Sequence, residues 1–163
     1  MKTFLRSLLS VALIVWLGAE AFFPVVAATV FGKLQPDTHT AGTIVGELLR
    51  ILHGTGLVAG MISLATITLM AAKHIFDPRK VLMPMGLLIA MMGLTLYSQF
   101  GIIPAMEQDR ISVGGDVNAA ALSNPGRIDF KRLHDRSERV EGLILLLGLA
   151  TIVLLARVES VES

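Results

Sequence analysis

Four long apolar stretches dominate this sequence and limit what it can fold into. They cover residues 8–31, 51–72, 81–103 and 140–156. A helix needs about 20 mainly apolar residues to cross the hydrocarbon core of a bilayer, and the four stretches reach or approach that length. The sequence therefore predicts an all-α membrane protein, a bundle of four transmembrane helices, with residues 1–163 forming a single domain.

Composition agrees with this prediction and excludes several classes of function. Apolar residues make up 53% of the chain and charged residues 17%, and the charges are bunched between the apolar stretches. The net charge of +1 predicts no nucleic-acid partner, since such a partner needs a concentrated basic face. The absence of cysteine excludes disulfides, thiolate metal sites and cysteine nucleophiles. No phosphate-binding loop, Ser-His-Asp set, HExxH motif or glycosidase-like acid pair is present, so we expect no enzymatic activity.

The first apolar stretch imitates a secretory signal, because Lys2 and Arg6 precede it and residues 25–27 could form a cleavage site. Its apolar run is about twice as long as a signal core of about 7–15 residues, so we expect a retained helix. Glu20 in its middle costs about 2.5–3.5 kcal/mol on insertion scales, whereas the apolar residues around it return up to about 4–8 kcal/mol. The stretch therefore still predicts a membrane span.

Four spans place both termini and the 73–80 connection on one side of the membrane, called here the terminal side. The 32–50 and 105–139 connections lie on the other, the loop side. The 105–139 connection is long, polar and expected outside the membrane, and beyond Gly126 it becomes a helical extension of the fourth span. The predicted helices are 5–31, 42–74, 81–104 and 128–157.

The basic residues give two opposing indications of orientation. Charges close to the spans and in short connections weigh most, and the first helix usually dominates, which favours cytoplasmic termini. The raw count, six basic residues on the terminal side against eight on the loop side, favours the opposite orientation. We expect cytoplasmic termini.

The segment 130–141 predicts an amphipathic helix that leads into the fourth apolar stretch. At 100° per residue, His134, Ser137 and Glu141 fall on its apolar face, while lysine and arginine occupy the opposite face. We therefore expect the charged face to meet water, and His134 and Glu141 to point into the bundle.

The other three predicted helices also carry polar side chains in their loop-side halves. Glu20 lies in the first, and Arg50 and His53 lie in the second. Gln99 lies near the loop-side end of the third. Ionisable groups inside a membrane are costly and usually face the interior, so we predict one buried polar cluster in which Glu20 has a basic or hydrogen-bonding neighbour. Its candidate members are Glu20, Arg50, His53, Tyr97, Ser98, Gln99, His134, Ser137 and Glu141.

These side chains also have purely structural explanations. Glu20 can pair with Arg50 or His53 to join two helices, or it can bind a ligand or a proton. His134 can lie among the headgroups, and Arg50 can extend to the membrane surface or pair with Glu47. The polar residues of the third helix can simply hydrogen-bond to neighbouring helices. His39 and His74 occupy connections and receive no assigned role.

The methionines suggest a copper(I) site, but helical geometry argues against it. Met83 and Met85 are two residues apart and therefore point about 200° away from each other, so packing is the better interpretation. We expect no cofactor, and the alternative is haem or copper bound by His53 and His134. Gly56 and Gly60 form a pair of small residues that lets another helix approach closely.

Several short segments carry a family resemblance that covers about residues 8–156. They are Trp16-Leu17-Gly18 with Phe22-Phe23, Arg50-Ile51-Leu52-His53, Leu94-Thr95-Leu96-Tyr97-Ser98-Gln99-Phe100 with Pro104, and Phe130-Lys131-Arg132-Leu133-His134 with Ser137. The chain resembles the transmembrane protein 205-like family, catalogued in bacteria as a domain of unknown function. The resemblance implies a small four-helix protein of the bacterial inner membrane without an assigned reaction. Glu141 departs from it, because the family pattern leads us to expect Asn there.

Three classes of function remain open. We favour a non-catalytic membrane component whose polar cluster organises the bundle or a partner helix. The alternative is a haem- or metal-binding membrane protein. A further alternative is an oligomeric small-solute or proton-coupled transporter that uses Glu20, Arg50 and Glu141. The expected partners are the lipid bilayer and a second copy of the chain or another membrane protein.

Overall fold

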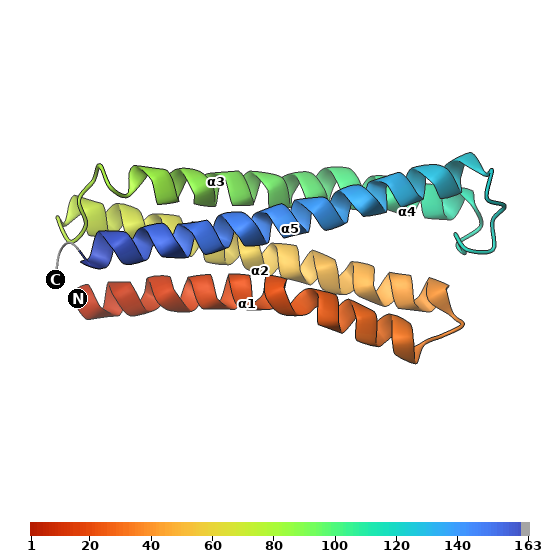
Figure 1. Ribbon diagram of the computed structural model, residues 1–163, viewed down its shortest axis with the longest axis horizontal. Helices are drawn as coiled ribbons and strands as arrows, with labels where there is room; N and C mark the ends of the chain where they lie inside the picture. The colour runs from red at the N-terminus through yellow and green to blue at the C-terminus, as the bar shows by residue number, and fades with distance from the viewer. Residues whose placement is uncertain (161–163) are drawn as a thin grey trace.

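The structure is a computed structural model that describes residues 1–160 (Figure 1). No strand occurs among the described residues. The elements in chain order are α1 (Lys2–Lys33), α2 (Thr38–Ala72), α3 (Leu82–Tyr97), the π-helical turn η1 (Ser98–Ile102), α4 (Ile103–Ser112) and α5 (Pro125–Ser160). Because α3, η1 and α4 follow one another without a break, they form one rod, and the molecule is a bundle of four long helices.

Each of these four helices is long and apolar enough to cross a membrane. The corresponding segments are Lys2–Lys33, Thr38–Ala72, Leu82–Ser112 and Pro125–Val158. Many large apolar side chains face outward, as Phe100 does, which suits a surface covered by lipid. The predicted all-α bundle of four transmembrane helices is confirmed, and the protein is an integral membrane protein.

The long third connection is shorter than the sequence predicts. Helix α4 continues the third span to Ser112, and α5 begins at Pro125, so the irregular segment covers 113–124, whereas the predicted helix ends left 105–127 outside the helices. Polar residues alone do not end a helix, whereas Gly114 and Gly115 do so here by adopting φ angles of 83° and 96°. The predicted helical extension before the fourth span is confirmed.

The two halves of the bundle pack differently. In the terminal half all four helices share one core, whose fully buried members include Trp16, Ile67, Leu88 and Ile144. Toward the loop side, α1 stays against α2 and α4 stays against α5, and Figure 1 shows these two pairs diverging. We call them the α1–α2 arm and the α4–α5 arm.

Two prolines shape the region where the arms separate. Pro24 has no N–H group, so the carbonyl of Glu20, four residues earlier, loses its helical hydrogen bond. The buried residues of α1 end at Glu20, and Figure 1 shows α1 bending away after its first half. Pro104 likewise frees the carbonyl of Phe100, inside the wider turn of η1. The prolines therefore account for both departures from straight α-helix.

Helix α2 begins with a side-chain cap at the loop-side surface. The carboxylate of Asp37 accepts a hydrogen bond from the backbone N–H of Thr40 at 2.9 Å. Hydrogen bonding to Thr40 lowers the pKa of Asp37 below its usual value. A capped start explains how α2 remains helical above the membrane span, where it carries His39 and Thr43.

Candidate functional site

His53 lies at the centre of a polar cluster inside the bundle. It belongs to α2, is completely buried, and contacts two other segments. Its Nδ1 atom is 3.0 Å from Oε1 of Gln99 in η1, and its Nε2 atom is 3.0 Å from Oε1 of Glu141 in α5. His53 therefore connects three of the four long helices.

Glu141 of α5 links the same three helices, because its carboxylate contacts both α2 and η1. Its Oε1 atom also accepts a hydrogen bond from Oγ of Ser98 at 2.9 Å. Ser98 and Gln99 are consecutive residues of the π turn, so η1 presents two polar side chains to the cluster at once. The second carboxylate oxygen of Glu141, Oε2, is buried and has no hydrogen-bond partner among the described residues.

Glu20 enters the cluster from α1. Nε1 of Trp16, one turn earlier, donates a hydrogen bond to Oε1 of Glu20 at 3.2 Å, and both side chains are buried. Glu20 also interacts electrostatically with Glu141 and His53. The predicted hydrogen-bonding neighbour of Glu20 is thus confirmed, although it is the indole of Trp16. We call Glu20, His53, Ser98, Gln99 and Glu141 the interior cluster.

The glycine pair of α2 holds Trp16 in place. A Cβ atom at Gly56 would lie 2.9 Å from Cδ1 of the indole, and one at Gly60 would lie 2.8 Å from Cζ3. The groups that approach these glycines are side chains of other helices, the indole of Trp16 at both positions and also Met92 at Gly60. The glycines therefore position the donor that satisfies Glu20.

Arg50 is not part of the interior cluster. It lies exposed on α2, and its electrostatic partner is Glu107 of α4. The predicted approach of Arg50 to Glu20 is wrong. The buried residues of α2 in this region are Leu52, His53 and Gly56. Arg50 lies three residues before His53 and is therefore turned about 60° around the helix, out of the buried stripe.

His134 does not point into the bundle, contrary to the prediction. Its side chain is 49% exposed, its Nε2 atom is 3.3 Å from Oε1 of Glu138, and its ring stacks on Phe130. The buried positions of α5 in this region include Ser137 and Val140. His134 is not one of these positions.

Tyr97 and Ser137 make no hydrogen bond to the interior cluster among the described contacts. Tyr97 is exposed, and its hydroxyl oxygen accepts a hydrogen bond from Nη1 of Arg136 at 3.2 Å. Ser137 is buried on α5, one turn before Glu141, without a hydrogen bond among those described. The candidates Arg50, Tyr97 and His134 therefore lie outside, while Glu20, His53, Ser98, Gln99 and Glu141 come together.

The histidine pair suggested as haem or metal ligands is not brought together. Both ring nitrogens of His53 already face side-chain oxygens, and His134 faces outward. Over the part of the chain that the structure describes, no group of three or more His, Asp or Glu side chains is arranged to hold a metal ion. What the interior cluster offers chemically is two carboxylates, an imidazole, an amide and a hydroxyl.

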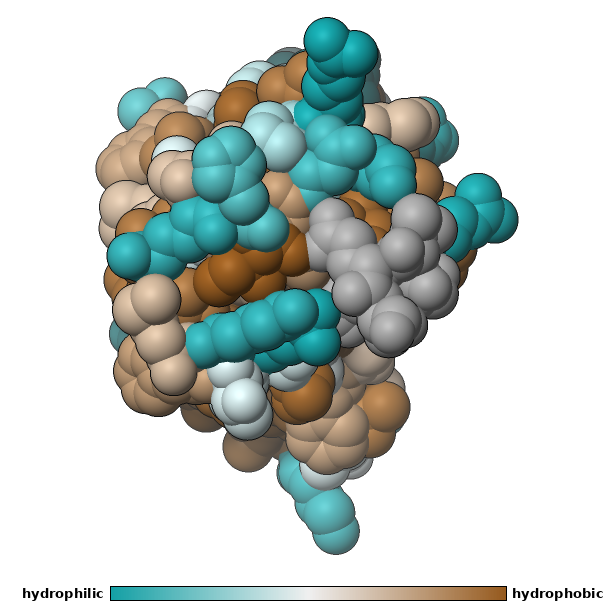
Figure 2. All heavy atoms as spheres, turned by 90° about the vertical axis from the view of Figure 1, so that its left-hand side faces the viewer, coloured by the Kyte–Doolittle hydropathy of each residue, from teal (hydrophilic) through white to brown (hydrophobic). Residues whose placement is uncertain are grey.

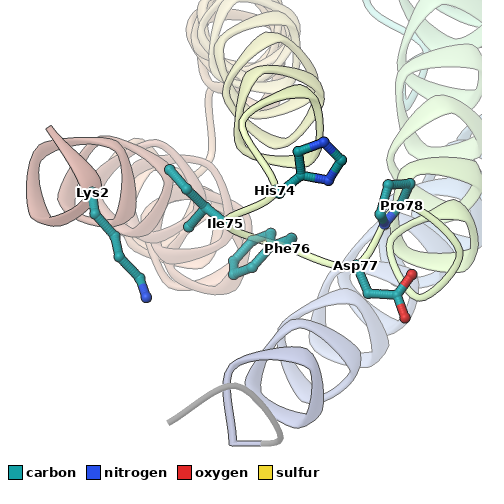
Figure 3. A pocket seen from close by; sticks show the side chains of 6 residues that line it. All are labelled: Lys2, His74, Ile75, Phe76, Asp77 and Pro78. Carbon is teal, nitrogen blue, oxygen red and sulfur yellow. The ribbon is translucent and has the colours of Figure 1, made fainter.

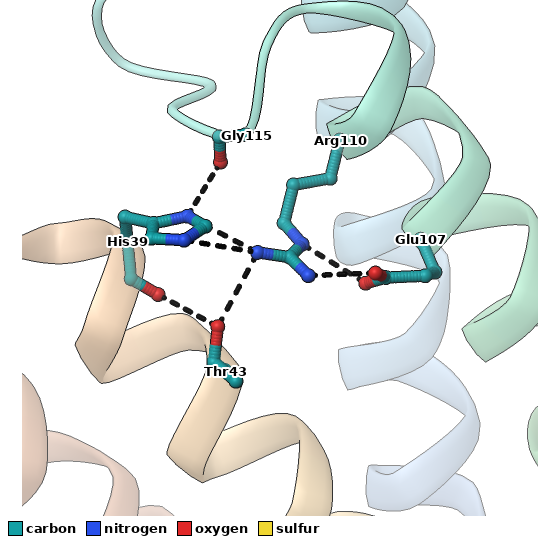
Figure 4. Close-up of polar contacts among 5 residues, drawn as sticks. All are labelled: His39, Thr43, Glu107, Arg110 and Gly115. Carbon is teal, nitrogen blue, oxygen red and sulfur yellow. Dashed lines mark hydrogen bonds and ion pairs between the residues drawn. The ribbon is translucent and has the colours of Figure 1, made fainter.

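A second polar cluster, which sequence reasoning missed, connects the two arms at their loop-side ends (Figure 4). Nε and Nη2 of Arg110 donate to the two carboxylate oxygens of Glu107 at 2.9 and 2.6 Å. Nη1 of Arg110 donates to Oγ1 of Thr43 in α2 at 3.3 Å. Nδ1 of His39 lies 2.7 Å from the carbonyl oxygen of Gly115. We call His39, Thr43, Glu107, Arg110 and Gly115 the loop-end cluster.

The ring of His39 is best assigned with its proton on Nδ1. Arg110 Nη1 lies 3.1 Å from Nδ1 and 3.5 Å from Nε2 of this ring. A guanidinium only donates, and Nδ1 cannot both donate to the Gly115 carbonyl and accept from Arg110. The shorter bond to Gly115 decides in favour of an Nδ1–H donor. The spacing of Glu107 and Arg110 was visible in the sequence, but their neighbours on α2 were not.

The terminal face carries a hollow among polar side chains. Figure 2 shows this face with hydrophilic groups around exposed apolar surface, and Figure 3 shows the hollow close up. It is lined by Lys2, His74, Ile75, Phe76, Asp77 and Pro78. The amino group of Lys2 and the carboxylate of Asp77 lie on opposite sides of the view and do not converge on a common point (Figure 3). We assign no site to this hollow.

Comparison with known proteins gives a family without an assigned activity. A family model described as a domain of unknown function (DUF4149) matches residues 11–110. The match includes Glu20, His53, Ser98 and Gln99, whereas Glu141 lies beyond it. No curated protein and no solved structure matches the chain. Since the model matches more than half of the sequence, this integral membrane protein belongs to the DUF4149 family of domains of unknown function.

Proposed function

We propose that the protein is a non-catalytic membrane component, similar to transmembrane protein 205-like proteins, in which the interior cluster joins the helices where the two arms separate. The observation that carries this proposal is that one oxygen, Oε1 of Glu141, contacts His53 of α2 at 3.0 Å and Ser98 of η1 at 2.9 Å. One carboxylate on α5 thereby links two other helices.

The position of this link explains why it matters for the bundle. Between transmembrane helices there is little hydrophobic driving force, so packing and polar contacts hold them together. On the loop side of the interior cluster the two arms diverge (Figure 1). Interhelical hydrogen bonds in membranes contribute about 0.6–2 kcal/mol each, and a buried pair that loses one partner costs more. The interior cluster therefore supports the last level at which all four helices meet.

The proposal also includes the membrane, the orientation and the partners of the protein. The bundle resides in the bacterial inner membrane with its termini in the cytoplasm, supported by Lys73, Arg79 and Lys80 in the short terminal-side connection. Fluorescent and phosphatase fusions to the C-terminus test this orientation.

The proposed partners of the protein are lipid and a second copy of the chain or another membrane protein, and the protein works without haem or copper. The outward position of His134 weighs against the haem or copper alternative.

The proposed link is tested by a conservative change at Glu141. Glu141→Gln keeps the shape of the side chain but removes the charge that His53 and Ser98 contact, which costs about 1.5–3 kcal/mol for hydrogen bonds to a charged group. We expect a clearly lower midpoint of thermal unfolding in detergent. The matched control is Glu138→Gln, less than one turn away on the same helix, where the side chain is 68% exposed. Equal midpoints for the two variants would contradict the proposed function.

A further inference from the structure

Three ionisable side chains from three different helices meet in the interior of the described bundle: Glu20 of α1, His53 of α2 and Glu141 of α5. Glu20 is 4% exposed and His53 is fully buried, while the side chain of Glu141 is 17% exposed. A charged group in such a place is stable only if other charges balance it. The distribution of protons among these three groups is therefore the central question for this site.

The geometry around His53 indicates that the imidazole carries two protons. Nδ1 faces the amide oxygen of Gln99 and Nε2 faces the carboxylate oxygen of Glu141, both at 3.0 Å. A neutral imidazole has one N–H donor and so can satisfy only one of two acceptors. An imidazolium satisfies both, and its positive charge is then balanced by the carboxylate of Glu141.

Glu20 is the third ionisable group of the site, and the charges of His53 and Glu141 already balance each other without it. Among the described residues, the ionisable groups that interact with Glu20 are His53 of α2 and Glu141 of α5. If Glu20 were ionised, the three groups together would have a net charge of −1 in a medium of low dielectric constant. If Glu20 holds a proton, the net charge is zero. The indole N–H of Trp16 donates to Oε1 of Glu20, which leaves the other carboxyl oxygen to carry that proton.

We propose that Glu20, His53 and Glu141 form a proton-binding site inside the bundle, in which Glu20 holds an exchangeable proton beside the His53–Glu141 ion pair. On release, the O–H bond of the Glu20 carboxyl breaks, its electron pair stays on the carboxylate, and the proton passes to water. The ligand is thus the proton itself. The inference rests on the proposed linking role of the same cluster, but it assigns that cluster a chemical task in addition.

The bend in α1 provides the direction from which the proton is exchanged. Glu20 is the last buried residue of α1, and the residues after it leave the bundle at Pro24. The loop-side arms diverge from that level onward (Figure 1). Glu20 therefore lies at the boundary between the packed core and the loop-side half, and it exchanges its proton toward the loop side.

Infrared spectroscopy of the full chain in lipid nanodiscs tests the proposal directly. At a pH where exposed carboxylates are ionised, we expect a carbonyl stretching band from a protonated carboxylic acid, which shifts in heavy water. The band should vanish in Glu20→Gln and persist in Glu138→Gln. Its absence from the wild-type spectrum, or its persistence in Glu20→Gln, overturns the proposal.

A second measurement on the wild-type protein keeps the test decisive if Glu20→Gln does not fold. Nitrogen NMR of labelled histidine distinguishes rings with one and two N–H groups, and His53 is assigned by comparison with variants of His39, His74 and His134. We expect two N–H groups on His53, and a ring with one contradicts the site. Failure here leaves the thermal comparison of Glu141→Gln with Glu138→Gln untouched, so the proton site and the linking role are judged separately.

Discussion

The interior cluster and the loop-end cluster use similar side chains in different surroundings. Each contains a histidine, a carboxylate and a hydroxyl group, and each joins α2 to the other arm. In the interior cluster His53 is fully buried. In the loop-end cluster the side chains of Arg110 and Glu107 are 21% and 39% exposed. The chemistry is comparable, so the difference between them is mainly one of environment.

This difference in exposure indicates which of the two clusters contributes more to the stability of the bundle. Charges near water are screened, and exposed ion pairs contribute about 0–1 kcal/mol. Buried pairs interact more strongly, and each charged member destabilises the folded protein when its partner is removed. The interior cluster should therefore determine stability, whereas the loop-end cluster should determine how the two arms are held at their ends. The following predictions test this contrast, beginning with the largest effect.

Removing His53 should have the largest effect. His53→Leu leaves the carboxylate of Glu141 buried without its imidazole partner, and breaking a buried pair in this way costs about 3–5 kcal/mol of unfolding free energy. The double variant His53→Leu, Glu141→Leu should recover much of the loss, because an apolar pair replaces both charges. Unfolding of the detergent-solubilised protein measures both variants against the wild type. A double variant no better than the single one would show that the pair is not the cause.

Adding a methyl group at Gly56, which contacts Trp16, should have an intermediate effect on stability. Gly56→Ala places a methyl group against the indole, and overpacking of this kind costs about 1–3 kcal/mol. Gly54→Ala is the matched control, since a Cβ there meets nothing within 4 Å. Trp16 is the only tryptophan in the chain, so its fluorescence reports the displacement without interference. If the two variants give the same emission and stability, then Gly56 does not position Trp16.

Removing Arg110 should have the smallest effect on stability. Arg110→Ala breaks the contacts with Glu107 and Thr43, and the expected loss is less than about 1 kcal/mol because these groups are partly exposed. The loss should shrink further at high salt, whereas the loss for His53→Leu should not. Unfolding at low and high salt separates the two. A large, salt-independent effect of Arg110→Ala would remove the distinction between the clusters.

Much of the fold could be predicted from the sequence because membrane helices are encoded locally. The apolar stretches are long, and the backbone of each span is satisfied within its own helix. Helix ends were less accurate. The segment 105–112 is polar yet helical, because a helix above the membrane can hydrogen-bond internally whatever side chains it carries. Only the glycines with positive φ ended it.

The sequence indicated that every long helix contributes polar residues to the interior, but it did not separate the buried ones from the exposed ones. Helical periodicity placed His134 and Glu141 on one face, and the structure separates them. Glu141 contacts His53 of α2 and Ser98 of η1, whereas the side chain of His134 is 49% exposed and contacts Glu138 and Phe130 of its own helix. Periodicity gives the direction of a side chain on its own helix and contains no information about the neighbours.

What the sequence by itself determined is therefore the number of spans, their helical state and the concentration of polar groups toward the loop side. Tertiary structure decided which groups meet. The bend at Pro24 and the π turn before Pro104 set where α1 leaves the bundle and how Ser98 and Gln99 face it. Contacts between distant segments, such as His53 with Glu141 or His39 with Gly115, depend on those bends. Local patterns cannot encode them, because a small change of helix direction moves its far end by several ångströms.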